Sequence, residues 1–391
     1  ETLMAFDDRD KLTHVTDPLG NVTRYQYDGL DNPVSIISPD TGTTASEFDS
    51  AGNRIVVTDA RGVRIEYRYD ELNRVTDTLY PDSSRDVYLS YDAGSFGKGR
   101  LTGMTDEAGS VSYEYNAQGK LLSEIRLIGE QQYLTRYSYN SAGRLIQIEY
   151  PSGTTIDLSL DGTGRTIALH AGAQTLVEEV RYAPFGPVSS FNYGNGLSFS
   201  AEFNLDYERV QLESGSGQIL SLDYGPAGNI RSINNQAFTY DELHRLASTS
   251  GDTGSQIFEY DANGNRLHSQ HDLNIRSYTY EINSNRLHTA GDWLFTHDRA
   301  GNRTSKLDSS GHGQLFSYGD HNRLEETIDR SPSGDRQSGS YLHDGKGRRV
   351  VKSTPVGETH FIYNPSGQLL GEYSALGDGI YREYVYLHGH A

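Results

Sequence analysis

The chain has 391 residues, of which 35% are hydrophobic, and its mean hydropathy is −0.64. A sequence this polar cannot build the large apolar cores of a compact multidomain enzyme, so that class of protein is disfavoured. The net charge of −19 disfavours charge-driven binding to nucleic acid or to anionic membranes. The absence of cysteine excludes disulfides, thiol catalysis and cysteine zinc sites.

Strands joined by tight turns are indicated by the residue usage, since the chain contains 42 glycines and 28 tyrosines but only 2 methionines. No apolar run approaches the roughly 18 residues of a membrane-spanning helix. No leader peptide opens the chain, which begins at Glu1 within a repeat, and we expect it to be a segment of a longer protein.

A short motif recurs along the chain. An aromatic residue, a variable residue, a tyrosine and an aspartate or asparagine end at Asp28, Asp70, Asn116, Asn140, Asp241 and Asp261. Asp28, Asp49 and Asp70 are spaced by 21 residues, and Asp241, Asp261 and Glu281 by 20. A period of about 20 to 24 residues fits one β-hairpin per unit.

The ends of these hairpins are encoded by turn residues. An aspartate or asparagine comes first and glycine fourth in 49–52, 140–143, 298–301 and 364–367, and the opposite ends carry the same pattern in 17–20, 59–62 and 106–109. This order predicts a type I turn followed by a left-handed glycine, which lets a bulged hairpin rejoin its ladder.

The six to eight residues between turns are long enough for a strand, and apolar residues alternate with polar ones in 63–69. Tyrosines at equivalent positions should stack between neighbouring strands and contribute about 0.2–1 kcal/mol per pair. We therefore predict structural roles, with no catalytic, cofactor or metal function, for the repeat residues Tyr27, Asp28, Gly52, Tyr69, Asp70, Tyr115, Gly119, Tyr139, Gly143, Tyr240, Asp241, Tyr260, Asp261, Gly264, Gly301, Tyr363 and Gly367.

A long meander of hairpins must protect its edges, and the sequence therefore predicts an all-β fold in which one antiparallel sheet curls into a shell. A β-propeller is the alternative, because two units of 21 residues make 42, close to one four-stranded blade. No alternation between two kinds of hairpin supports that alternative. An irregular stretch at about 170–235, interrupted by 215–217 and 224–226, predicts a bend.

Other patterns suggest chemistry only weakly. Residues 261–265 with Asp272 resemble a calcium loop, but the glycine is fourth rather than sixth. The histidine pairs 268/271 and 388/390 lack a helix or carboxylate partner for zinc, and 94–100 lacks the lysine ending of a phosphate loop. Adjacent carboxylates such as 7–8 and 178–179 point to opposite faces of a strand and cannot act together. We expect no enzyme activity, no cofactor and no metal.

The repeat resembles the YD repeats, or Rhs repeats, of bacterial Rhs proteins and of Tc toxin C subunits, and more distantly those of teneurins. The resemblance covers essentially the whole chain and includes the motifs at 182–186, 193–196, 261–266 and 371–373. It implies one repeat array over residues 1–391, forming a curved single-layer sheet that is part of a hollow spiral shell, or cocoon.

The resemblance also implies that such a shell encloses a C-terminal toxin polypeptide before delivery. A core-associated segment, with its Asp-His-Leu-Gly-Thr-Pro-like motif, and the toxin domain are expected to follow this chain, whose last strand near 383–391 would lead into them. The expected partners are the protein's own toxin domain or other shell segments, with dimerisation through exposed sheet edges possible. The expected location is secreted or cell-surface, and the alternative function is adhesion to a glycan or protein.

Overall fold

The computed structural model describes residues 1–252, 254–377 and 379–387, and in them 37 β-strands and one 3-10 helix, Ser83–Arg85. The predicted all-β class is therefore confirmed. The last residues of the strand expected near 383–391, with His388 and His390, lie outside the described residues.

The strands of the first part of the chain are β1 (Leu3–Phe6), β2 (Leu12–Thr16), β3 (Val22–Tyr27), β4 (Pro33–Ser38), β5 (Gly42–Phe48), β6 (Arg54–Thr58), β7 (Arg64–Tyr69), β8 (Val75–Leu79), β9 (Val87–Tyr91), β10 (Leu101–Asp106), β11 (Gly109–Tyr115), β12 (Leu121–Ile128), β13 (Gln131–Tyr139), β14 (Leu145–Glu149), β15 (Thr155–Leu160), β16 (Thr166–Ala171), β17 (Gln174–Tyr182), β18 (Val188–Tyr193) and β19 (Ser198–Phe203). The later strands are β20 (Arg209–Ser214), β21 (Gln218–Tyr224), β22 (Ile230–Ile233), β23 (Gln236–Tyr240), β24 (Leu246–Gly251), β25 (Gly254–Tyr260), β26 (Arg266–His271), β27 (Asn274–Tyr280), β28 (Leu287–Ala290), β29 (Trp293–His297), β30 (Arg303–Leu307), β31 (Gly313–Tyr318), β32 (Leu324–Arg330), β33 (Arg336–His343), β34 (Arg349–Thr354), β35 (Gly357–Tyr363), β36 (Leu369–Ser374) and β37 (Ile380–Glu383).

Each strand pairs antiparallel with the next strand in the chain, from β1 with β2 to β36 with β37, so the sheet is one continuous meander. Among the described residues no group of strands separates into a blade, and the β-propeller alternative is wrong. Burial alternates along the strands, as expected for a sheet with one less exposed face. In β7, Ile65, Tyr67 and Tyr69 are half-buried on one face, while the residues between them are exposed.

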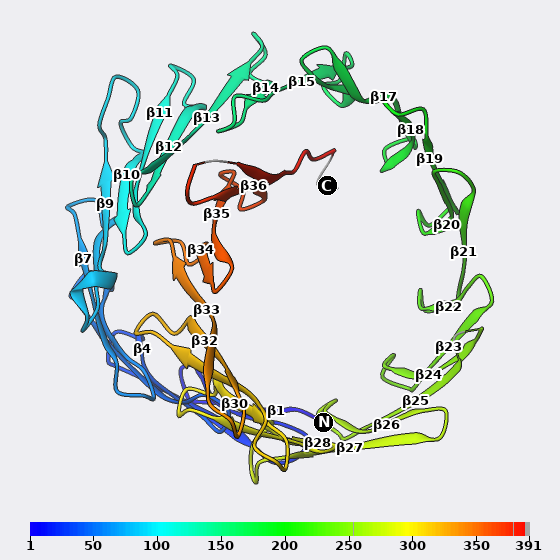
Figure 1. The fold of residues 1–391 in the computed structure, drawn as a ribbon. Helices are drawn as coiled ribbons and strands as arrows, with labels where there is room; N and C mark the ends of the chain where they lie inside the picture. The colour runs from blue at the N-terminus through cyan, green and yellow to red at the C-terminus, as the bar shows by residue number, and fades with distance from the viewer. Residues whose placement is uncertain (253, 378, 388–391) are drawn as a thin grey trace.

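The strip of strands curls into a coil. Viewed along the coil in Figure 1, the strands from β1 to β29 describe a ring, and β30 to β36 run inside the arc of β4 to β14. The surface area of 22046 Å² exceeds the roughly 15,000 Å² expected for a compact protein of this mass. Both faces of a single-layer sheet are open, and this accounts for the excess.

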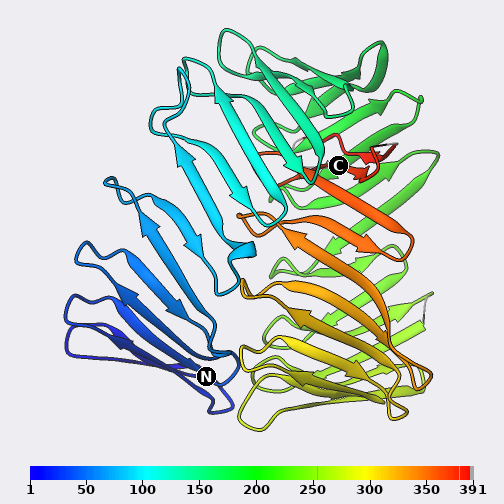
Figure 2. The same cartoon turned by 60° about the vertical axis from the view of Figure 1, so that its left-hand side comes forward.

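The second turn of the coil lies beside the first along a line that we call the seam (Figure 2). Contacts across the seam join residues separated by 214 to 268 positions, which is the length of one turn of the coil. At the seam, turns that follow even-numbered strands of the first coil turn meet turns that follow odd-numbered strands of the second. The turn 17–20 after β2 meets 261–265 after β25, and the turn 106–109 at the end of β10 meets 344–348 after β33.

Apolar burial is concentrated where the two turns of the coil meet. One cluster joins Ala108, Ile128 and Tyr133 to four residues of β34 to β36, which are Val350, Val351, Ile362 and Tyr373. A second joins residues of β15 to β17, with Tyr150, to Leu370 and Leu387. Two of the three apolar clusters among the described residues therefore form because the single layer coils on itself, and the third, around Met104, lies within the first turn.

Between 170 and 235 the ladder is irregular at β17, where the register with β18 shifts twice, between Glu178 and Arg181 and again before Tyr182. Glu179 takes a positive φ of 55° at this bulge. The single repeat array over 1–391, with a bend in this stretch, stays a prediction. In the described part of the chain, no helix has the length and apolar character needed to span a membrane.

Candidate functional site

The hairpin end that follows the tyrosine has a repeated geometry. At Asp28 the backbone amide donates to the Asn32 carbonyl at 3.1 Å, and the carboxylate accepts from the amides of Leu30 and Asn32 at 2.8 and 2.9 Å. Hydrogen bonds from the Asn32 side chain and amide hold the pKa of Asp28 below its ordinary value. The predicted turn is present, with a bulge where Tyr27 pairs with Pro33.

The repeat tyrosines bond to the backbone of the preceding repeat. The Tyr27 hydroxyl, at the end of β3, donates to the carbonyl of Leu12, the first residue of β2, at 3.0 Å. The same bond, from the last residue of one strand to the first residue of the strand before it, is made at 2.6 to 3.0 Å by Tyr69, Tyr91, Tyr115, Tyr139, Tyr182, Tyr224, Tyr240, Tyr260, Tyr280 and Tyr363. We call this bond the tyrosine latch.

An arginine joins the latch to the turn in several repeats. Arg245 donates to the Asp241 carboxylate at 2.6 Å, and its guanidinium lies 4.8 Å from the centre of the Tyr260 ring in the next repeat. The same triad is formed by Asp70, Arg74 and Tyr91, by Asp161, Arg165 and Tyr182, and by Asp344, Arg348 and Tyr363. Each triad connects two successive units.

The structure brings the predicted repeat residues together as latches and turns rather than as one site. Gly52, Gly119, Gly143, Gly264, Gly301 and Gly367 all have φ between 73° and 90°, the left-handed conformation that the turn requires. The sequence analysis expected ring stacking and missed both the hydroxyl bond and the arginine. The missed signal is the arginine directly after the left-handed residue, as in Asn73-Arg74 and Gly347-Arg348.

Tyr27→Phe should lower the free energy of unfolding by about 0.5–1.5 kcal/mol, because the variant removes one hydrogen-bond donor and leaves the Leu12 carbonyl without it. Urea unfolding followed by circular dichroism measures the change. The matched control is Tyr25→Phe on the same strand, since no described residue bonds the Tyr25 hydroxyl. Equal midpoints for the two variants would contradict a stabilising latch.

Polar side chains fasten the seam. Asp17, after β2, accepts from the side-chain amides of Asn263 and Asn285 at 2.6 and 3.2 Å, and Asp40 accepts from the Asn285 backbone amide at 2.7 Å and from the Ser284 hydroxyl at 2.8 Å. Burial opposes the charge of Asp17, but hydrogen bonds from the side chain and amide of Asn21 in the same turn, and then from Asn285 and Asn263 across the seam, outweigh it and lower its pKa to about 2. The two turns of the coil are therefore joined by a charged acceptor.

Asp17→Asn should destabilise the protein most above pH 4. The carboxyl has an ordinary pKa of 3.8 and a folded pKa of about 2, so its stabilisation is complete above 3.8 and is lost as the pH falls towards 2. The difference in melting temperature between the two proteins should therefore shrink over that interval. Exposed Asp8 gives the control variant, Asp8→Asn. A difference for Asp17→Asn that does not change with pH would contradict the assignment.

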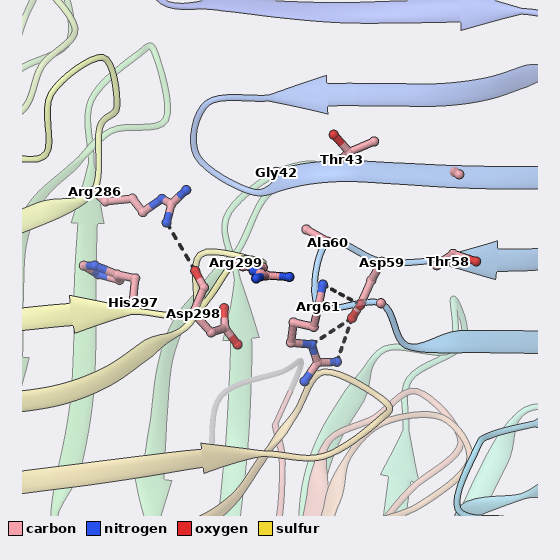
Figure 3. Close-up of a pocket in the computed structure, with 12 residues that line it drawn as sticks. Gly42, Thr43, Thr58, Asp59, Ala60, Arg61, Arg286, His297, Asp298 and Arg299 are labelled. Carbon is pink, nitrogen blue, oxygen red and sulfur yellow. Dashed lines mark hydrogen bonds and ion pairs between the residues drawn. The ribbon is translucent and has the colours of Figure 1, made fainter.

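A pocket of about 610 Å³ opens along the seam between the turns 59–62 and 298–301 (Figure 3). Arg61 lies at its edge, where it is bound to Asp59 at 2.8 Å and donates to the backbone carbonyls of Gly319 and Asp320 at 2.8 and 3.2 Å. Since these bonds occupy the guanidinium, it fastens the seam and is not presented to a ligand. Asp261, weighed above for calcium, is likewise occupied by the N–H groups of Asn263 and Asn265.

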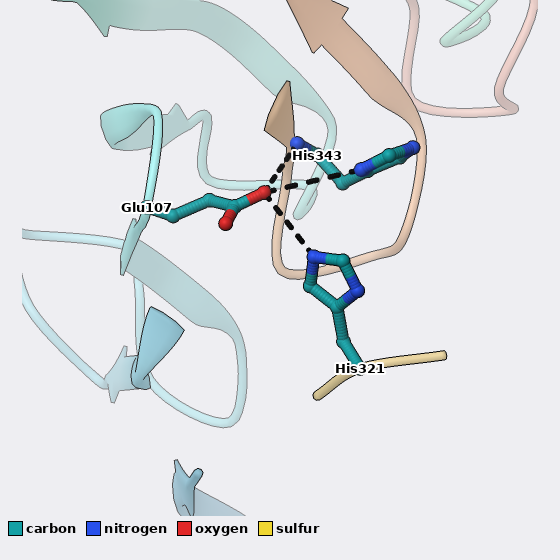
Figure 4. Close-up of side chains that lie close together, drawn as sticks. All are labelled: Glu107, His321 and His343. Carbon is teal, nitrogen blue, oxygen red and sulfur yellow. Dashed lines mark hydrogen bonds and ion pairs between the residues drawn. The ribbon is translucent and has the colours of Figure 1, made fainter. Parts of the chain in front are cut away.

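Glu107, His321 and His343 form a cluster of titratable side chains on the seam, with their ligand-type atoms within 4.8 Å of one another (Figure 4). They lie 214 and 22 residues apart in the sequence, from Glu107 to His321 and from His321 to His343. No local motif marks them, so the sequence analysis did not find them. They are the described residues best suited to hold a metal ion.

Three solved structures share the fold of this chain. A mutant Tc holotoxin pore from Photorhabdus luminescens matches 95% of the chain at 18% identity with a TM-score of 0.79, over 23% of its own length. TcdB2-TccC3 matches 95% at 18% identity with a TM-score of 0.80, over 24% of its length. TcdB2-TccC3 without its hypervariable C-terminal region matches 98% at 16% identity with a TM-score of 0.69, over 26% of its length.

These likenesses show the fold, and the chain spans about a quarter of the length of each of those proteins. A comparison with curated protein sequences finds no match. The family model for the RHS repeat matches residues 6–43, 48–85 and 97–127, which include the first latches and turns described above. The resemblance to the RHS repeats is thereby confirmed: the family model matches these three segments, and the chain as a whole shares the fold of the three solved structures.

Proposed function

We propose that this chain is part of the wall of a shell that encloses a C-terminal toxin polypeptide before delivery. The observation that carries the proposal is the path of the sheet, which coils through more than one turn and is bonded to itself along the seam (Figure 1). A wall of this kind separates an inner from an outer surface with one layer of strands.

The chemistry of the strip supports a structural role without catalysis. The repeated aspartates, arginines and tyrosines are occupied by bonds to one another and to backbone groups, as in the triad of Asp241, Arg245 and Tyr260. Only 35% of the residues are hydrophobic, so the wall offers an enclosed polypeptide few of the apolar contacts that would bind it permanently.

The partners in this proposal are the protein's own toxin domain and further shell segments, because the chain spans only about a quarter of the length of the structures it resembles. No described strand pairs with the outer edge of β1 or of β37, and such edges suit pairing with further strands or with a second copy. A container for a delivered toxin acts outside the producing cell, so the proposed location is secreted or cell-surface.

Limited proteolysis tests the proposal. In the full-length protein, the C-terminal polypeptide should resist protease while this repeat segment is present, and it should be degraded when the segment is deleted. Equal degradation of the two proteins would rule out enclosure. A glycan array and a pull-down with the fragment test the alternative, since reproducible binding of a glycan or protein partner would favour an adhesion module instead.

A further inference from the structure

The cluster of Glu107, His321 and His343 lies where three hairpin ends meet at the seam. Glu107 is in the turn between β10 and β11 of the first coil turn, while His321 is in the turn after β31 and His343 ends β33, both in the second (Figure 4). The three side chains are only 9 to 10% exposed. Any ion held here would therefore bind both turns of the coil at once.

The distances suit a metal ion with bonds of about 2.0–2.2 Å, which places ligand atoms roughly 3.3–3.5 Å apart in a tetrahedron. Oε1 of Glu107 lies 3.4 Å from Nε2 of His321 and 3.9 Å from Nδ1 of His343. All three ligand atoms lie within 4.8 Å of one another. Side-chain shifts smaller than the width of an atom would bring them into coordination.

His343 supplies an independent observation. Its Nδ1 is buried and has no hydrogen-bond partner among the residues that the structure describes, although its backbone amide donates to Glu107 at 2.6 Å. A buried nitrogen left without a partner destabilises a protein, and an ion would satisfy it.

Beside the three side chains is a cavity of about 40 Å³, lined also by Tyr80 and Arg85. A buried water needs roughly 10–15 Å³, so the cavity has room for an ion and one water molecule in the fourth position. Two imidazoles and one carboxylate are a zinc ligand set, whereas calcium and magnesium prefer oxygen ligands alone.

We propose that Glu107, His321 and His343 bind one Zn²⁺ ion, with water as the fourth ligand, and that this ion links the two turns of the coil across the seam.

Two features set a cost on binding. Nε2 of His321, which faces Glu107, must expose its lone pair to the metal, so the ring proton moves through solvent from Nε2 to Nδ1, and Nδ1 then gives up the 3.2 Å bond that it accepts from the Arg323 amide. The cavity also receives positive charge from Arg323 and from Arg85, of which Arg85 is neutralised by Glu325 at 2.6 and 2.9 Å. We therefore expect affinity to fall steeply on acidification and zinc to be removable by a chelator.

Zinc titration of the chelator-treated 391-residue chain, by calorimetry and by metal analysis after dialysis, tests the proposal. The expected result is one tight ion per chain and a higher melting temperature in zinc. Glu107→Gln and His343→Ala should each lower the affinity at least tenfold and abolish the rise in melting temperature. Cobalt in place of zinc should give the visible absorption of a tetrahedral site in the unaltered chain but not in Glu107→Gln or His343→Ala.

Exposed His288 on β28 provides the matched control, since His288→Ala should keep the tight ion. Glu107→Gln keeps the size of the side chain and an oxygen for the His343 amide, so this variant remains informative if His343→Ala fails to fold. Equal zinc binding by the unaltered chain and by folded Glu107→Gln would overturn the proposal. So would the absence of any tight ion on the unaltered chain.

Discussion

Arg126→Met should lower the free energy of unfolding by about 3–5 kcal/mol, the cost of leaving a buried carboxylate without its cation. Arg126 on β12 donates both of its terminal nitrogens to Asp106 at 2.6 and 2.7 Å, and the two side chains are 6% and 1% exposed. Asp106 also accepts from the Gly345 amide across the seam at 3.1 Å. The lost pair should therefore weaken the seam as well as the first turn of the coil.

Thermal and urea unfolding of the Arg126→Met protein give the measurement. Arg136→Met is the matched control on the adjacent β13, because Arg136 bonds Glu149 at 2.7 Å while 53% exposed. An exposed pair contributes about 0–1 kcal/mol, so this control should change little. Adding Asp106→Leu to Arg126→Met should recover part of the loss, since the unpaired charge is then gone. Similar effects of the two arginine variants would contradict the argument.

Leu370→Ala should lower the free energy of unfolding by about 2–5 kcal/mol through the cavity it leaves. Leu370, on β36, is 1% exposed and packs in the cluster with Tyr150, Ile156 and Leu169 of the first coil turn. Because this contact joins strands of different turns, its loss should open the seam before it disturbs the hairpins themselves. Residues 349–387 should become more accessible to hydrogen exchange than β3 to β8.

Leu376→Ala is the control for that prediction, since Leu376 follows β36 and is 82% exposed. It should leave both the unfolding midpoint and the exchange pattern nearly unchanged. If Leu370→Ala instead accelerates exchange uniformly over all repeats, the seam does not depend on this cluster.

The hairpins could be predicted from the sequence because the information is local. Asp49 and Gly52 are three residues apart, and both the turn and the left-handed glycine follow from residue type alone. The meander follows too, since each strand pairs with its neighbour in the chain. The tyrosine latch could be predicted only in part. The spacing of Tyr27 and Tyr69 is visible in the sequence, but the direction in which the hydroxyl points depends on the bulge beside it.

The seam could not be predicted, because which turns meet depends on the accumulated curvature of more than 200 residues. A small change in twist per strand would place a different hairpin opposite Asp17 than the one that carries Asn263. The cluster of Glu107, His321 and His343 was missed for the same reason, as its members meet only after a full turn. Arg126 and Asp106 lie 20 residues apart on one face, a spacing that the repeat itself suggests.

Among the described strands β1 to β37, pairing is between chain neighbours, whereas the contacts between coil turns involve side chains and turn backbone. We expect the ladder to assemble early and quickly, as sequence-local contacts do, and the closure of the spiral to be the slow, final event of folding. The contacts between the coil turns should therefore open and re-form reversibly while every hairpin stays intact.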